Sequence, residues 1–508
     1  MSKFPTGAAV ASIGRASLCS SLLVVLVAHG TAALALQGSG STSTAAARGQ
    51  VSFTPKRAPV VRSNVDAKGV TAEAAIARGA AAFTDEKFDV AVREYERAVA
   101  LAPASAEAHY WLGLSHYNLG NAAAAVASLQ RAVDLDPARV DTYTDLGLAY
   151  TDLQDFAGAK RAFRTGLVID AKVAGLWAGL GVAQALSGEL PTARASFDKA
   201  MALAPEDCDI RMAAATVAAE ERDFESAIAS AMKCQDSLKD DPSYWFALSK
   251  WYGALRKEDE AIICLEKTVR LKPTYVGYVY LGDVLSRAGR AEEALDAYQE
   301  AVRIDPKLPE AVSKVGMQYS YLGDYDQALF AMERAVELDP TSLDAKTALA
   351  NCYVNSERPS DAMATIAPVL EARPASPHAL ACAGEASAYV GALDAAAGYY
   401  ERALRADAKY DEARIWLAIC LAGLGRQDDA AGELGQVGQT PPAMAAFYER
   451  DLPGKKRPAL YLAVVAVLRG GAGDYVGVRR ALDAMRTHNA ALSDRMERLL
   501  KSVGRLRG

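Results

Sequence analysis

Histidines are the first residues to consider for metal chemistry. The 508-residue chain has five of them, at positions 29, 109, 116, 378 and 488. His109 and His116 lie seven residues apart, which could place both on one face of a helix. No third ligand accompanies them, and zinc needs three or four protein ligands. The sequence therefore predicts no metal site and no cofactor.

Motifs for catalysis are also missing from the sequence. There is no HExxH, no Walker-type phosphate loop and no G-x-S-x-G. The glycine-rich run Gly470–Gly473 follows a predicted helix and has no Lys-Ser/Thr after it, so it is better interpreted as a turn between helices. Only 66 residues follow Pro442, whereas a separate catalytic domain needs about 100. We therefore predict that the chain is not an enzyme.

Cysteines could form disulfide bonds or act as nucleophiles. Beyond Cys19, which lies in the N-terminal segment, they stand singly at positions 208, 234, 264, 352, 382 and 420, without CxxC spacing. The last four lie in apolar helical stretches, which favours buried thiols. Cys208 and Cys234 share one repeat, defined below, and are the pair to test for a bridge. Sequence alone does not fix their separation, so their redox state stays open.

Composition favours an all-helical protein. Hydrophobic residues make up 51% of the chain but aromatics only 7%, because alanine supplies much of the apolar share. Alanine favours helices, and the Val/Ile/Thr alternation of a β protein is missing. The net charge of −6 does not suit a nucleic-acid binder, which usually has a basic excess.

The N-terminal segment looks like a targeting signal. Lys3 and Arg15 precede an apolar run from Leu18 to Ala28, and Ala33-Leu34-Ala35 offers a small-residue cleavage pattern. We favour a signal peptide over residues 1–36 and therefore an exported protein, periplasmic or secreted. An uncleaved membrane anchor and a mitochondrial-type presequence remain open. Residues 37–71 are mostly small and polar, which is typical of a flexible linker.

The remaining chain repeats with a period of about 34 residues. Prolines at 103, 137, 205, 273, 306, 340, 374 and 442 are separated by one or two such periods. Placing this proline thirty-second in each repeat gives eleven repeats, which begin at residues 72, 106, 140, 174, 208, 242, 275, 309, 343, 377 and 411.

Other places in the repeat test this alignment. The twentieth place is alanine in all eleven repeats: Ala91, Ala125, Ala159, Ala193, Ala227, Ala261, Ala294, Ala328, Ala362, Ala396 and Ala430. The eighth place is always Gly, Ala or Ser, and the fifteenth is glycine in six repeats. Each repeat is predicted to contain two amphipathic helices, and Ala291–Ile304 is the second helix of one repeat. The small residues at the eighth and twentieth places would let the two helices approach closely. A larger side chain at Ala294 would overpack that contact, at about 1–3 kcal/mol.

These residues resemble the tetratricopeptide repeat. The signature places hold Leu112-Gly113, Ala125, Ala132 and Pro137 in one repeat, and Leu281-Gly282, Ala294, Tyr298, Ala301 and Pro306 in another. The resemblance covers residues 72–444 and implies an all-α, right-handed α-solenoid of about eleven helix pairs. Two departures stand out: the repeat at 208, with Cys234 at a signature place, and the 33-residue step from Pro273 to Pro306. Residues 445–508 are predicted to form a degenerate helix pair and a C-terminal capping helix.

The resemblance also predicts where a ligand would bind. The second, fifth, ninth, twelfth and thirteenth places of each first helix would face a concave groove. We expect that groove to include Tyr110, Tyr117, Asp141, Asp152, Phe246, Lys250, Asp283, Met317, Asn351 and Glu385. Packing between neighbouring helices is the competing explanation for Tyr110 and Tyr117. No first helix pairs a fifth-place lysine with a ninth-place asparagine, so the family's terminal-carboxylate clamp is not expected.

The function predicted from the sequence is a non-enzymatic scaffold that binds a protein or peptide in its groove, without nucleic acid. Two alternatives remain open. The chain could be an assembly subunit of a cell-envelope machine, bound through its C-terminal region. It could also be the regulatory arm of an enzyme on another chain, and membrane attachment through the N-terminal segment would fit each of these functions.

Overall fold

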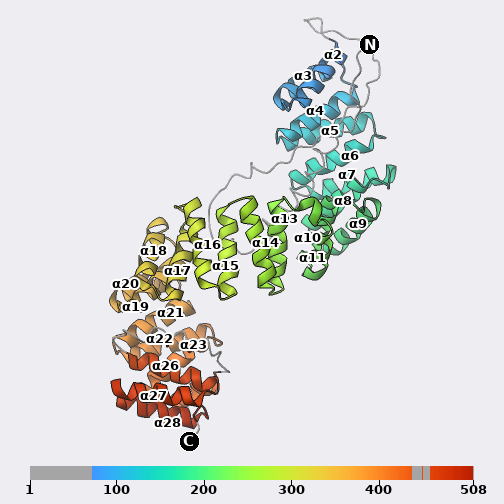
Figure 1. Ribbon diagram of the computed structural model, residues 1–508. Coiled ribbons are helices and arrows are strands. Elements are labelled where there is room, and N and C mark those ends of the chain that lie inside the picture. The colour runs from blue at the N-terminus through green and yellow to red at the C-terminus, as the bar shows by residue number, and fades with distance from the viewer. Residues whose placement is uncertain (1–70, 438–444, 446–448, 450–457, 507–508) are drawn as a thin grey trace. The chain divides into compact units, whose positions relative to one another are not determined.

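The computed structural model describes residues 71–437, 445, 449 and 458–506. In this part of the chain the secondary structure consists of helices, with no β-strand element (Figure 1). The all-α solenoid of helix pairs expected from the sequence is therefore confirmed. The predicted signal peptide or anchor and almost all of the linker lie outside the described residues. None of the described helices is long and apolar enough to cross a membrane.

The chain divides into two bodies, of which the N-terminal one ends at Leu271. Its first helices are α2 (Ala72–Thr84), α4 (Ala106–Asn118), α6 (Val140–Asp152), α8 (Ala174–Leu186), α10 (Cys208–Glu220) and α13 (Pro242–Ala254). Its second helices are α3 (Phe88–Leu101), α5 (Ala122–Leu135), α7 (Phe156–Ile169), α9 (Leu190–Leu203), the interrupted pair α11 (Phe224–Met232) and α12 (Gln235–Leu238), and α14 (Glu258–Leu271).

The C-terminal body begins at Lys272, inside the one repeat that is a residue shorter than the others. Its first helices are α15 (Tyr275–Arg287), α17 (Pro309–Leu322), α19 (Leu343–Asn355), α21 (Pro377–Tyr389), α23 (Asp411–Gly423) and α26 (Pro458–Gly471). Its second helices are α16 (Ala291–Ile304), α18 (Tyr325–Leu338), α20 (Pro359–Ala372), α22 (Leu393–Ala406), α24 (Gln427–Gly435) and α27 (Tyr475–His488), and α28 (Ala490–Ser502) follows them. The bounds predicted for Ala291–Ile304 are those of α16.

A left-handed backbone residue separates the two helices of every repeat. Six repeats use glycine there, with φ between 77° and 86°. The other five place a residue with a side chain at the same position, with φ between 57° and 64°: Glu86, Gln154, Arg222, Arg256 and Glu357. The turn geometry is thus common to all eleven repeats, although the glycine that favours it is present in only six.

The two helices of a repeat approach closely at the small residues. All eleven twentieth-place alanines are 0% exposed. A Cβ added to Gly147 would come within 2.5 Å of the Phe163 ring, and one added to Gly282 within 2.5 Å of the Tyr298 ring. The large side chain sixteen residues later therefore fills the space that the eighth-place glycine leaves, and this contact forms the core of the repeat.

The last helix packs on more than the helix pair that precedes it. α28 packs back onto α23 and α24 as well as onto α26 and α27. Its Leu492, Leu499 and Leu500 belong to the same core cluster as the α23 side chains. Arg495 of α28 donates a hydrogen bond to the carbonyl of Gly423 at the end of α23. The amphipathic pattern predicted this helix, but its buried face completes the eleventh repeat rather than only covering the twelfth helix pair.

Candidate binding face

The first helices lie next to one another within each body. α4 contacts α2 and α6 in the N-terminal body, and α17 contacts α15 and α19 in the C-terminal body. Successive first helices contact one another from α2 to α10 and from α15 to α26, so their second, fifth, ninth, twelfth and thirteenth places form rows of side chains along these helices. We call these rows the first-helix face.

Tyr110 lies inside this face rather than on its surface. It is 1% exposed, and the guanidinium carbon of Arg139 lies 3.8 Å from the centre of its ring. Its hydroxyl hydrogen-bonds to the carboxylate of Asp145, at the sixth place of the next first helix. In this conformation a partner would contact Arg139 and not the ring of Tyr110. The rule based on repeat positions placed Tyr110 on the first helix, but it did not predict that Arg139 covers the ring.

Asp145 is the most perturbed acid near this face. It is 5% exposed, and its Oδ2 has no hydrogen-bond partner. Burial raises the pKa of Asp145 to about 7, although the hydrogen bond from Tyr110 acts in the opposite direction. The sequence rule missed this residue because the sixth place does not belong to the expected face. The only signal in the sequence was an acid directly before the apolar Leu146 of a predicted first helix.

The other predicted residues of the N-terminal body differ in exposure. Tyr117 is half-buried and packs against the core around Trp111, whereas Asp141 and Asp152 are exposed. Phe246 and Lys250 are half-buried one turn apart on α13. Burial lowers the pKa of Lys250, and the charge of Glu220 partly offsets this effect.

In the C-terminal body the ninth places of α15, α17, α19 and α21 form what we call the ninth-place row: Asp283, Met317, Asn351 and Glu385. Asp283 accepts a hydrogen bond from the Tyr298 hydroxyl and one from the Lys314 ammonium, each at 2.7 Å. Glu385 accepts a hydrogen bond of 3.3 Å from the Tyr461 hydroxyl of α26. The two acids are therefore held by neighbouring helices.

Between those acids the row is open to solvent. Met317 is 45% exposed, Asn351 is exposed, and Tyr321, one turn after Met317, is 50% exposed. Tyr321 is at the thirteenth place, so the position rule could have found it. Lys314 is at the sixth place and was not predictable from the rule. This stretch offers apolar and amide contact area on one face.

The described residues contain no group of three or more side chains placed to hold a metal ion. His109 Nε2 lies 3.1 Å from the carbonyl oxygen of Pro103. Burial lowers the pKa of His116, whose Nδ1 has no hydrogen-bond partner. The two histidines thus belong to helix packing and its adjoining turn.

The comparison with known families agrees with the geometry. Four tetratricopeptide-repeat models match the chain, at residues 67–140 and 144–208, 242–275, 276–308, and 321–383 and 390–446. The chain belongs to the tetratricopeptide-repeat family. Proteins of this family generally bind other proteins or peptides, and the fold is typically a non-catalytic scaffold. The matched ranges leave out residues 209–241, which form most of the interrupted fifth repeat.

Three solved structures are among those that match this chain. The C-terminal part of a tetratricopeptide-repeat protein from Cytophaga hutchinsonii is 18% identical, covers 47% of this chain and 99% of its own, and has a TM-score of 0.41. A tetratricopeptide repeat protein from Parabacteroides merdae is 16% identical over 49% and 98%, with a TM-score of 0.40. Yeast Tom70 is 15% identical over 85% and 95%, with a TM-score of 0.35. Among curated protein sequences, no match was found.

Proposed function

We propose that the chain is a non-enzymatic scaffold that holds an extended peptide or a partner protein on its first-helix face. The observation that carries the proposal is the middle of the ninth-place row. There Met317 and Tyr321, 45% and 50% exposed, lie beside Asn351 on contacting helices. Exposed apolar area next to a hydrogen-bonding amide suits a peptide backbone and its side chains.

The fixed acids at both ends of the row support this proposal. Asp283 and Glu385 are each held by a hydrogen bond from another helix, so a partner would meet a preformed surface. Preformed contacts reduce the entropy lost on binding, which lets many weak contacts add up.

Site-specific photo-crosslinking in the native cell tests the proposal. A photoreactive residue would replace Met317 or Asn351 in the full chain. The matched control position is Phe330, which is 67% exposed but lies on the second helix α18. We expect adducts from the first two positions and few from the third. Adducts mainly from Phe330 would move the binding surface to the second helices and contradict the proposal.

The same crosslinks distinguish the two alternative functions. Components of a cell-envelope machine among the adducts would indicate an assembly subunit, and an enzyme whose activity copurifies with the chain would indicate a regulatory arm. Intrinsic turnover by the purified chain would contradict the non-enzymatic part of the proposal.

A further inference from the structure

The fifth repeat has a broken second helix. The uninterrupted second helices of the N-terminal body run for 14 residues, but here α11 ends after nine, at Met232, and the four-residue α12 begins at Gln235. Cys234 lies at the break, with φ −102° and ψ 5°. The helix therefore loses its backbone continuity at the place where most other repeats carry alanine or glycine.

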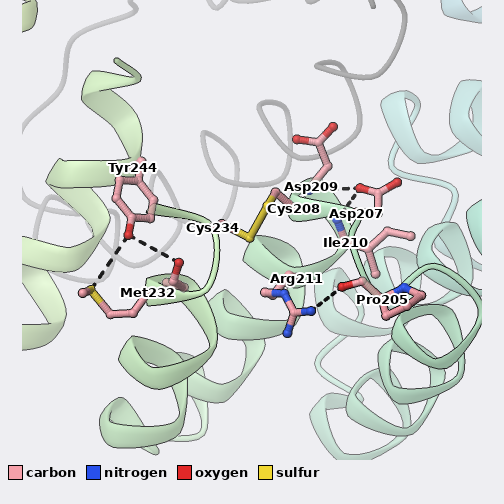
Figure 2. Close-up of a disulfide and its surroundings, with 10 residues drawn as sticks. Pro205, Asp207, Cys208, Asp209, Ile210, Arg211, Met232, Cys234 and Tyr244 are labelled. Atoms are coloured by element: carbon pink, nitrogen blue, oxygen red, sulfur yellow. Dashed lines mark hydrogen bonds between the residues drawn. A yellow bond between two sulfur atoms is a disulfide. The ribbon is translucent and has the colours of Figure 1, made fainter. Parts of the chain in front are cut away.

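A disulfide bond crosses this break. Cys234 is 1% exposed and is bonded to Cys208, the first residue of α10, with the two Cα atoms 5.5 Å apart (Figure 2). That distance is usual for a disulfide. The bond joins the start of the first helix to the broken end of the second, and it closes a covalent ring around most of the repeat.

The following repeat holds the same broken end from its other side. Tyr244 of α13 is 1% exposed, and its hydroxyl donates a hydrogen bond of 3.3 Å to the carbonyl of Ala231 (Figure 2). α11 offers nine residues to this interface where an unbroken helix offers 14. The shorter helix has less apolar area to stack on α13, so the covalent bond compensates for part of the lost packing.

The other cysteines of the described chain are unsuited to this chemistry. Cys264, Cys352, Cys382 and Cys420 are free and buried. Burial raises the pKa of the Cys264 thiol to about 11 and that of Cys420 to about 12. Each of the four also stands alone in its repeat, whereas Cys208 and Cys234 share one repeat and lie within bonding distance.

We propose that Cys208 and Cys234 are a dedicated oxidation site, and that the bond between them holds the fifth repeat against the sixth. The oxidant is the disulfide of a thiol–disulfide exchange protein. One cysteine thiolate attacks that disulfide, forms a mixed disulfide and releases the partner's first thiolate. The second cysteine thiolate then attacks the chain's own sulfur in the mixed disulfide, which forms the Cys208–Cys234 bond and releases the partner's second thiolate. The two thiols of the chain lose two protons and two electrons in total, and the partner's disulfide gains them as two thiols.

This proposal has a consequence for localisation. Disulfides persist in oxidising compartments and are rare where glutathione and thioredoxin keep thiols reduced. If Cys208 and Cys234 are oxidised in the cell, we expect the chain to work in the periplasm, the secretory pathway or the extracellular space. This is the destination that the apolar N-terminal run predicts, and the two arguments use different residues.

Peptide mapping of the full chain from its own cells tests the oxidation directly. Free thiols would be alkylated before unfolding, and the chain would then be digested without reduction. We expect a linked peptide pair that contains Cys208 and Cys234, while the four buried cysteines react only after denaturation. A digest without the linked pair, in which Cys208 and Cys234 are both alkylated before or after denaturation, would overturn the proposal.

Limited trypsin digestion tests the role of the bond. Lys233 and Lys239 are exposed and flank Cys234 and α12. Because proteolysis follows the population of the opened segment, reduction should speed cleavage at both lysines by about tenfold or more. The double variant Cys208→Ser/Cys234→Ser should be cut equally fast without reductant. The control Cys264→Ala removes a free cysteine of the same body and should keep the response to reductant. Equal cleavage rates in oxidised and reduced wild-type protein would contradict the stapling role.

Discussion

At the scale of single residues, the turn between the two helices shows how strongly the fold constrains the backbone. Five repeats place a residue with a side chain where φ is positive, although such a residue is less stable there than glycine. The array tolerates this cost because neighbouring helices fix the turn geometry. Substituting glycine at these five positions should remove the conformational strain.

Replacing Gln154 by glycine should stabilise the N-terminal body. Gln154 is exposed and has φ 60°, so Gln154→Gly removes the left-handed strain and should raise the free energy of unfolding by about 1 kcal/mol. The reverse control is Gly188→Ala in the next repeat, where φ is 80° and an added Cβ meets no atom within 4 Å. This control should lose a similar amount. Urea unfolding measures both, and a destabilised Gln154→Gly would contradict the explanation.

Asp145 should make stability depend on pH. Its folded pKa of about 7 lies above the ordinary carboxyl value, so the folded state binds the proton more tightly than the unfolded state. The stabilisation is complete below about pH 4 and is lost as the pH rises towards 7. Asp145→Asn keeps an acceptor for Tyr110 and removes the charge. At pH 8 it should raise the free energy of unfolding by about 1–3 kcal/mol.

The control for Asp145 is the exposed acid Asp198 on α9, whose charge does not contribute to the raised pKa of Asp145. Asp198→Asn should leave the pH profile of unfolding nearly unchanged. If the profiles of wild-type and Asp145→Asn proteins run parallel between pH 4 and 8, Asp145 is not the group that titrates.

At the scale of elements, the contact between two helices of a repeat depends on which face an alanine occupies. Ala362 and Ala364 lie two residues apart on α20, but Ala362 is 0% exposed and Ala364 is exposed. The same substitution has the same effect on helix propensity at both positions. A difference in the free energy of unfolding between the two variants therefore measures packing alone.

Leucine at these two positions should have different consequences. Ala362→Leu should overpack the contact with α19 and lower the free energy of unfolding by about 1–3 kcal/mol. Ala364→Leu should change it by less than about 0.5 kcal/mol. Chemical denaturation of both variants measures the difference, and equal losses would show that the buried contact does not determine the stability of this repeat.

At the scale of the whole molecule, the array has no single core, because each repeat is stabilised mainly by its neighbours. The C-terminal end departs from this scheme, since α28 returns to α23 and α24. Leu499 is 1% exposed within that core, whereas Arg498 beside it is exposed. Removing residues 445–508 would therefore uncover the side of α23 that α28 buries.

The α28 contact predicts a local loss of stability. Leu499→Ala should lower the free energy of unfolding of the C-terminal body by about 2–5 kcal/mol, because it leaves a cavity in the shared core. Arg498→Ala on the same helix is the matched control and should change it little. Hydrogen exchange of the α23 amides is the measurement, and unchanged protection in Leu499→Ala would show that α28 does not support the eleventh repeat.

The sequence alone determined the helix pairs, their period and the buried alanines, because the same packing contact between two helices recurs about every 34 residues in eleven repeats. It also singled out Cys208 and Cys234, since both lie in a repeat that departs from the family pattern. Only the tertiary structure decided that these two thiols meet, that Arg139 covers Tyr110 and that α28 folds back onto α23. The distances between these residues depend on how the chain folds in three dimensions. A rule about residue spacing within one repeat does not predict them.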